Sequence, residues 1–466
     1  MKRFPLAAAF WTMCGTAAAE GEPQAAIELY VDTTTRQIFA EPGPGRQRLG
    51  RFVQASDTPA PAVVTTAQPA VSTQQVAVAP PSAVSTSKGK AWYEKLSIRG
   101  YVQMRYNQEI GGGAKDLRSP GDRFIGREQG FGVRRARVVI SGDVSDRMSI
   151  YLQPDLASTP SGSTTTHFAQ LRDAYADLWL DADKEWRVRA GQSKIPFGWE
   201  DLQSSQNRIA LDRADALNSA VRDERDLGLF LYWSPKEIKE RFAYLQKSGL
   251  KGSGDYGMFG VGVYNGQGAN RPDRNDQLHT VVHFSYPFKF ANGQYLEVGA
   301  DAYSGRYKVS TASVSVDGRT FTPTVDAPLA GSTDRRVAAH VVYYPQPFGF
   351  QAEWTVGKGP ELDIAQRRVR TRSLRGGYAQ VMYKFDTAHG GFIPYAKWQT
   401  YRGGAKFDTN APRMSVDELE AGVEWQPSSA VELAVAFANM RRTDVGAAPY
   451  RKIDGKLLRM QLQVNY

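Results

Sequence analysis

The chain has 466 residues, a formal net charge of +10 and a single cysteine, Cys14. Beyond residue 19 it has no apolar run approaching the roughly 20 residues that a membrane-spanning helix requires, so a helical membrane protein is excluded. It carries 22 Tyr, 21 Phe, 9 Trp and 44 Gly, yet its mean hydropathy is negative. This combination is typical of a transmembrane β-barrel, whose strands alternate lipid-facing and lumen-facing residues.

The first 19 residues are predicted to be a secretory signal peptide. Lys2 and Arg3 form a basic start, an apolar stretch follows, and Ala17–Ala19 supplies small residues for cleavage. The only cysteine leaves with this segment, so the mature protein is expected to contain no disulfide. Removing the two basic residues lowers the formal charge from +10 to +8. This excess favours anionic partners, and no clustered basic helix points to nucleic acid.

Residues 20–54 are predicted to form a short periplasmic segment with one possible hairpin, 27–31 against 37–40. The basic residues Arg46, Arg48 and Arg51 follow as a tail. This segment either contacts peptidoglycan or another periplasmic partner, or is a weakly ordered extension. Residues 55–94 are rich in Pro and Ala and are predicted to be an extended linker.

From residue 95 the pattern changes to strict alternation. In 96–107 one face carries Leu96, Ile98, Val102 and Met104, and the other carries mostly polar side chains, including Arg105. The same alternation predicts sixteen strands, near 95–107, 131–142, 147–155, 170–180, 185–193, 226–234, 255–264, 277–288, 294–308, 335–344, 349–357, 375–386, 391–402, 416–426, 430–440 and 455–466.

The lengths of the connections predict how these strands are arranged. Short turns are expected at 143–146, 181–184, 345–348, 387–390 and 427–429, alternating with long loops at 108–130, 194–225, 309–334, 358–374 and 441–454. Strict alternation of this kind is typical of an outer-membrane barrel. The predicted fold is therefore all-β, a 16-stranded antiparallel transmembrane barrel over 95–466 with both ends on the periplasmic side. A soluble periplasmic β-sandwich is the alternative. The connection 235–254 is longer than this scheme explains.

Four stretches occur in an order that resembles a known family. They are Phe131–Arg137, Leu171–Tyr175, Gly191–Glu200 and Arg225–Gly228. Together they resemble the phosphate-selective porin O and P family of bacterial outer membranes. The resemblance implies a trimeric barrel in outer-membrane lipid that passes small inorganic anions along a series of Arg and Lys side chains. It leaves open whether phosphate, polyphosphate or anions in general are preferred.

The segment 194–225 is too long and too charged for a hairpin turn. Ala210, Ala214, Leu217 and Val221 recur at helical spacing, so part of it is predicted to be helical. We expect this constriction loop to fold into the pore, with Lys194 near its root. Its basic residues are Arg208, Arg213, Arg222 and Arg225.

Strand phase nominates the residues that line the anion pathway. The candidates are Arg99, Arg105, Arg135, Arg137, Arg187, Arg189, Lys194, Lys384, Lys397 and Arg459. Such cations can pass an anion from one to the next if none holds it too tightly. In the alternative hypothesis these cations pair with inward-facing acids. The candidate acids are Asp173, Asp177, Glu297, Asp301, Glu353, Glu420, Glu424 and Glu432.

No catalytic or cofactor site is predicted. His279, His283 and His340 share the inward phase, but their spacing does not enforce the three converging ligands of a metal site. No nucleophile, base and acid fall in an activating turn. The hypothesis is therefore a porin and not an enzyme, allowing passive diffusion of small anions. The competing hypothesis is a plugged or weakly selective barrel that acts mainly as a cell-wall anchor.

Overall fold

A computed structural model describes residues 27–32, 38–39, 41–52, 91–126, 130–158 and 167–466. The predicted signal peptide and nearly all of the predicted linker lie outside these residues. The chain divides into two compact units, Met1–Ser85 and Thr86–Tyr466. Among the described residues no helix is long and apolar enough to cross a membrane.

The first unit is a three-stranded antiparallel sheet in the order β2-β1-β3. The predicted hairpin is present as β1 (Ile27–Asp32) and β2 (Ile38–Phe39). The prediction that Arg46, Arg48 and Arg51 belong to a tail is wrong, because they form β3 (Arg46–Phe52) along the other edge of β1. The strand is held partly by an ion pair between Arg48 Nη2 and Glu28 Oε1 at 2.5 Å.

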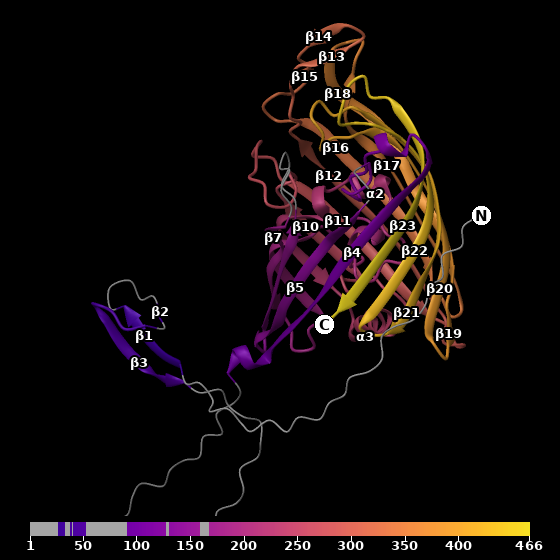
Figure 1. Ribbon diagram of the computed structural model, residues 1–466. Helices are drawn as coiled ribbons and strands as arrows, with labels where there is room; N and C mark the ends of the chain where they lie inside the picture. The colour runs from indigo at the N-terminus through magenta and orange to yellow at the C-terminus, as the bar shows by residue number, and fades with distance from the viewer. Residues whose placement is uncertain (1–26, 33–37, 40, 53–90, 127–129, 159–166) are drawn as a thin grey trace, which may run out of the picture. The chain divides into compact units, whose positions relative to one another are not determined.

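The second unit is the predicted barrel (Figure 1). Sixteen strands of the described chain close into it, and β23 pairs with β4 to complete the ring. In chain order they are β4 (Leu96–Gly112), β5 (Phe131–Ser145), β6 (Met148–Ser158), β7 (Phe168–Trp179), β8 (Trp186–Lys194), β9 (Arg225–Trp233), β10 (Phe259–Tyr264), β11 (His279–Lys289), β12 (Tyr295–Tyr307), β16 (Ser332–Tyr343), β17 (Phe348–Asp363), β18 (Arg368–Tyr383), β20 (Gly390–Gly404), β21 (Arg413–Ser428), β22 (Val431–Thr443) and β23 (Lys452–Asn465).

The barrel is polar inside and apolar outside, as the alternation predicts. In β4 the side chains of Gln103 and Arg105 are buried in the lumen, whereas Ile98 is 72% exposed and Met104 is 40% exposed on the outer face. A soluble sandwich would bury the apolar face and expose the polar one, so the alternative fold is excluded. Outer-face aromatic rings stack beside the short turns, for example Trp186 on Trp233 at 5.7 Å between ring centroids.

Small elements cap the two ends of the barrel. The helical turns η1 (Trp92–Lys95) and η2 (Ala114–Asp116) flank β4. At the end with long connections lie β13 (Val314–Val316), β14 (Arg319–Phe321) and β15 (Thr324–Val325), and at the opposite end lie β19 (Phe385–Thr387) and α3 (Lys236–Lys247) (Figure 1).

Two connections differ from the sequence prediction. The predicted loop 358–374 is instead a hairpin, because β17 and β18 continue to pair until Asp363 faces Arg368. Charged side chains there hide the alternation, but Arg370 and Arg372 both pair with Asp363 and the backbone ladder persists. The unexplained connection 235–254 contains α3, which buries Ile238, Phe242 and Leu245, and β10 begins only at Phe259.

A charge on the outer face should destabilise the barrel. Leu229 lies in the middle of β9 and is 51% exposed on the outer face. Leu229→Arg is expected to lower the free energy of unfolding by about 2–4 kcal/mol, since it puts a cation against lipid near the bilayer midplane. Guanidinium unfolding in phospholipid vesicles measures this change.

The matched control is Leu329→Arg, in a connection between strands where the side chain is 83% exposed. This variant should unfold like the wild type. Equal destabilisation of both variants would contradict a lipid-facing position for Leu229.

Candidate functional site

The connection between β8 and β9, residues 195–224, lies inside the barrel and is largely buried. It contains the short helices α1 (Trp199–Leu202), α2 (Asp215–Asn218) and η3 (Arg222–Glu224), so part of it is helical as predicted. Lys194 lies at its root, and its Nζ donates to the carbonyl oxygens of Leu202 and Gln203, both at 2.8 Å. Because the ammonium group is engaged in these two hydrogen bonds, Lys194 stabilises the loop rather than facing a passing anion.

The barrel wall holds this loop through its backbone. Glu353 accepts hydrogen bonds from the N–H groups of Trp199 (2.7 Å) and Glu200 (3.1 Å). Asp301 accepts one from the N–H of Gly198 (2.8 Å). On the far side of the loop, Arg336 donates to the carbonyl oxygen of Ser219 at 2.8 Å. The loop is therefore fixed to β12, β16 and β17.

Eight of the fourteen basic candidates form ion pairs. The pairs are Arg105 with Asp122 and Asp212 (both 3.0 Å), Arg137 with Asp155 (2.8 Å), Arg187 with Asp255 (3.4 Å), Arg189 with Asp177 (2.8 Å), Arg213 with Glu224 (2.6 Å), Arg225 with Glu224 (2.6 Å) and Arg459 with Glu420 (2.8 Å). Lys397 pairs with Glu200. These eight cations are therefore paired with acids, as the alternative hypothesis for the lumen residues states.

Strand phase could not reveal several of these acids. Asp122, Asp212 and Asp255 belong to connections, which period-two alternation does not place. They enter the lumen because the connections fold inward. The arginines of the early strands are therefore largely neutralised by acids that these connections bring into the lumen.

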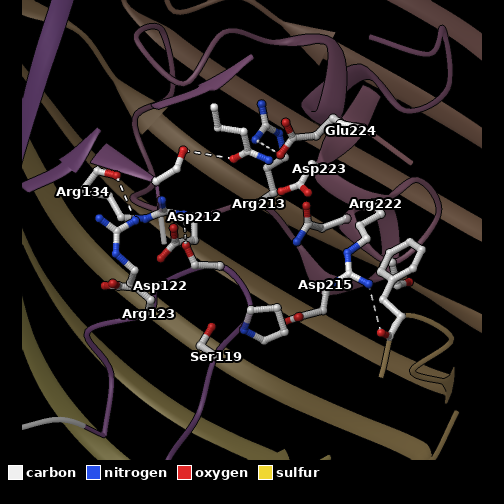
Figure 2. A pocket seen from close by; sticks show the side chains of 18 of the residues that line it. Ser119, Asp122, Arg123, Arg134, Asp212, Arg213, Asp215, Arg222, Asp223 and Glu224 are labelled. Atoms are coloured by element: carbon white, nitrogen blue, oxygen red, sulfur yellow. Dashed lines mark hydrogen bonds and ion pairs between the residues drawn. The ribbon is translucent and has the colours of Figure 1, made fainter. Parts of the chain in front are cut away.

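A vestibule of about 1020 Å³ opens on the side of the long connections, and Figure 2 shows side chains that line it. Its lining comes from the β4–β5 connection, β5, the inserted loop and the connection after β20. Four of its arginines form the basic cluster, Arg123, Arg134, Arg135 and Arg208. In the described part of the chain, none of the four has a carboxylate within ion-pair distance.

The basic cluster is held by neutral oxygens. Arg123 Nη2 donates to the carbonyl oxygen of Ala157 (2.7 Å) and Arg134 Nη2 to that of Gly121 (2.8 Å). Arg135 donates to Gln103 Oε1 (2.8 Å). Arg208 donates to the carbonyl oxygen of Leu211 (3.2 Å) and keeps Nε and Nη1 without a partner among the described residues.

Like charges crowd this cluster. Burial, followed by the positive charge of Arg213, lowers the pKa of Arg208 to about 9. Burial, followed by the positive charge of Arg134, lowers the pKa of Arg123 to about 10. Both residues lie in connections outside the membrane-crossing strands. A bound anion would relieve this repulsion, so the geometry suits transient anion contact.

Arg123 and Arg134 are absent from the sequence-based candidates. Arg134 falls on the outward phase, but the register of β4 and β5 shifts between Gln103 and Met104, and this bulge admits Arg134 to the lumen. Arg123 lies in a connection, where alternation has no meaning. The only feature of the sequence that could have indicated Arg134 is its position next to Arg135 in a predicted strand.

The sequence profile of the family described as phosphate-selective porin O and P matches residues 104–466. The chain belongs to this family. It is therefore an outer-membrane porin with a barrel that forms a channel. A comparison with curated protein sequences found no match.

Solved structures of outer-membrane channels are similar to this porin at low sequence identity. The outer membrane channel DcaP of Acinetobacter baumannii is 12% identical with a TM-score of 0.47, covering 80% of this chain and 97% of its own. An anion-selective porin from Comamonas acidovorans is 11% identical with a TM-score of 0.44, covering 80% and 99%. OmpF of Salmonella typhi, solved in complex with daunomycin, is 12% identical with a TM-score of 0.48, covering 80% and 98%.

The remaining candidates of this porin lie apart from the basic cluster. Arg99 is exposed and donates to Ser141 Oγ at 3.0 Å. Lys384 donates to the carbonyl oxygen of Gly249 at 3.3 Å. Arg222 lines the vestibule and donates to the carbonyl oxygen of Phe407 at 3.2 Å, at the other side of the view in Figure 2 from Arg123 and Arg134.

The ion pair of Arg189 and Asp177 should stabilise the wall of this porin. Its side chains are only 5% and 10% exposed. Arg189→Gln is expected to lower the free energy of unfolding by about 3–5 kcal/mol, because a buried carboxylate loses its partner. The double variant with Asp177→Asn should recover most of this loss. Guanidinium unfolding of both variants checks the pairing, and a double variant as unstable as the single one would contradict it.

Proposed function

We propose that this porin allows passive diffusion of small anions, with selectivity set by the basic cluster. The observation that carries the proposal is the vestibule above the inserted loop, where the cluster faces an open volume without ion-pair partners among the described residues. Among the described residues, eleven Arg and Lys side chains and seven Asp and Glu side chains line this vestibule. The excess of cations supports attraction of anions from solution.

A tetrahedral oxyanion such as phosphate is the proposed preferred solute. A guanidinium group donates two parallel hydrogen bonds to an oxyanion, and Arg208 offers unpartnered donors in the vestibule. The surrounding contacts of the cluster are neutral carbonyl and amide oxygens, which bind more weakly than carboxylates. A site of this kind can hold an anion briefly and release it, as conduction requires.

A second candidate function is a plugged barrel that serves as an anchor. It is favoured by the segment 235–258, which packs under the inserted loop: Leu245 and Leu250 form a buried cluster with Trp199 and Tyr295. Gln203 Nε2 also donates to the carbonyl oxygen of Lys251 at 2.6 Å. These contacts fill the lumen on the side of the short turns. No conductance is expected from a barrel that stays plugged.

The assembly and its surroundings are part of the proposal. Family membership supports a homotrimer in outer-membrane lipid, and a mass in mild detergent three times that of one chain would agree with it. A monomeric mass in unboiled, detergent-extracted protein would contradict it. Because β4 begins at the end with short turns, we propose that the preceding residues lie in the periplasm and that the first unit contacts peptidoglycan there.

Charge removal in the basic cluster tests the selectivity. Arg135→Gln combined with Arg208→Gln is expected to lower the anion-to-cation permeability ratio by at least about tenfold, since each lost charge contributes about 1 kcal/mol at contact distance in water. Single channels should persist. The reversal potential in planar bilayers under a salt gradient measures the ratio, and added phosphate should reduce the chloride current of the wild type only.

The matched control is the double variant Arg189→Gln and Asp177→Asn, which removes a paired cation and its acid together. Its reversal potential should equal that of the wild type. An unchanged potential in the Arg135 and Arg208 variant would overturn the selectivity proposal. Absence of channels in the wild type would favour the plugged anchor.

A further inference from the structure

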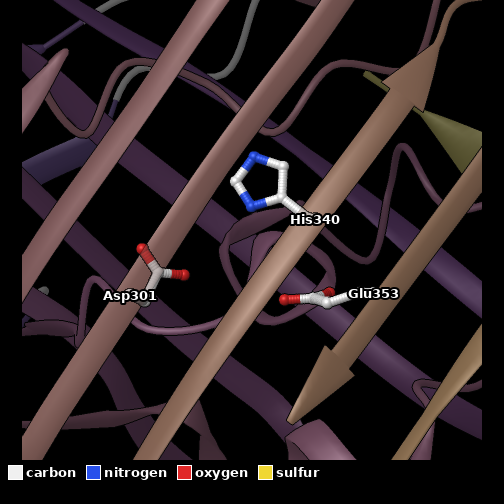
Figure 3. A group of neighbouring side chains, drawn as sticks. All are labelled: Asp301, His340 and Glu353. Carbon is white, nitrogen blue, oxygen red and sulfur yellow. The ribbon is translucent and has the colours of Figure 1, made fainter.

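A second cluster of buried side chains lies on the opposite wall, at β12, β16 and β17. Asp301, His340 and Glu353 each direct one ligand atom to a common point, and these atoms lie within 4.8 Å of one another (Figure 3). The placement follows from the sheet. His340 is directly opposite Glu353 in the ladder, and Asp301 lies two residues from Gly299, which pairs with His340.

This cluster lacks the cationic partners found elsewhere in the lumen. Asp301 is paired only with His283, whose Nδ1 lies 2.6 Å from Asp301 Oδ1, and no Lys or Arg among the described residues lies within ion-pair distance of Glu353. Both carboxylates are 2% exposed. Buried carboxylates are stable when paired or bound to a metal ion.

His340 supplies an independent observation. It is 6% exposed, and its Nδ1 has no hydrogen-bond partner among the described residues. Figure 3 shows one ring nitrogen of His340 turned towards the two carboxylates. The other nitrogen, Nε2, lies 3.3 Å from Ser285 Oγ. An imidazole nitrogen aimed at two buried carboxylates is a donor set for a metal ion.

Surrounding groups orient the two carboxylates. The backbone N–H groups of Gly198, Trp199 and Glu200 donate to Asp301 and Glu353, as described above. Metal-binding carboxylates are commonly fixed by such outer hydrogen bonds. Two ligand atoms on one tetrahedral Zn²⁺ lie about 3.4 Å apart, so the three side chains, whose ligand atoms lie within 4.8 Å of one another, would move together on binding.

We propose that Asp301, His340 and Glu353 form a binding site for a divalent transition-metal ion such as Zn²⁺. One nitrogen and two carboxylate oxygens suit Zn²⁺, whereas Mg²⁺ and Ca²⁺ take all-oxygen sites. A bound ion neutralises the buried carboxylates and joins three wall strands at the point where the inserted loop is attached. The site is independent of which solute passes through the pore.

Metal titration of the full-length, untagged protein in detergent tests the site. After treatment with a chelator, the wild type is expected to bind one Zn²⁺ per chain by isothermal titration calorimetry, and excess Mg²⁺ should not displace it. His340→Ala should weaken binding at least about tenfold. The matched control is His279→Ala, which removes a buried histidine outside the cluster and should leave Zn²⁺ affinity unchanged.

Folding is checked by the mobility of unboiled protein on gels. If His340→Ala does not fold, the visible spectrum of Co²⁺ bound to the wild type decides, because a nitrogen-ligated tetrahedral ion is expected. An octahedral all-oxygen spectrum, no binding of Zn²⁺ to the wild type, or equal affinity in the His340 and His279 variants would overturn the proposal.

Discussion

The whole structure depends on pairing every backbone N–H and C=O group that faces lipid. A closed ring of strands satisfies this requirement, and irregular backbone is tolerated only where it is buried within protein. The ring closes between β23 and β4, where Gly100 and Tyr466 exchange hydrogen bonds of 2.7 and 3.0 Å. The long irregular segment 195–224 consequently lies in the lumen, and its backbone is satisfied by wall side chains such as Glu353.

In the closed barrel, polar side chains face the interior and apolar side chains face outward, which is the reverse of a soluble protein. The lumen collects the charged side chains, and in a narrow space each one must meet an opposite charge or a polar group. Most do, as Arg189 does with Asp177. Among the described residues, the basic cluster around Arg135 and the carboxylate of Glu353 have no ion-pair partner, and Asp301 pairs only with a histidine. The two proposed binding properties of this lumen, for anions and for a metal ion, rest on these charges of opposite sign on two walls.

Much of the fold could be predicted from the sequence because the strands pair regularly. The prediction failed where bulges or folded connections interrupt this regular pairing. Alternation correctly placed Arg105 and Arg137 in the lumen, where both side chains are buried. It misplaced Arg134 because one bulge changes the phase. It could not supply Asp122 or Asp212, whose positions depend on how connections fold. The helix α3 was missed because its inward packing depends on partners such as Trp199 that are distant in sequence.

The inserted loop is braced mainly by residues outside the basic cluster. Lys194 and Arg213 both donate to the carbonyl oxygen of Gln203, at 2.8 and 2.9 Å, and Glu353 holds the start of α1. Arg208 contributes one hydrogen bond, and that bond stays within the loop. The width of the constriction is therefore determined by the wall carboxylates and by internal bracing. In the proposed function, ion preference depends on the basic cluster, so charge and pore width can change independently of each other.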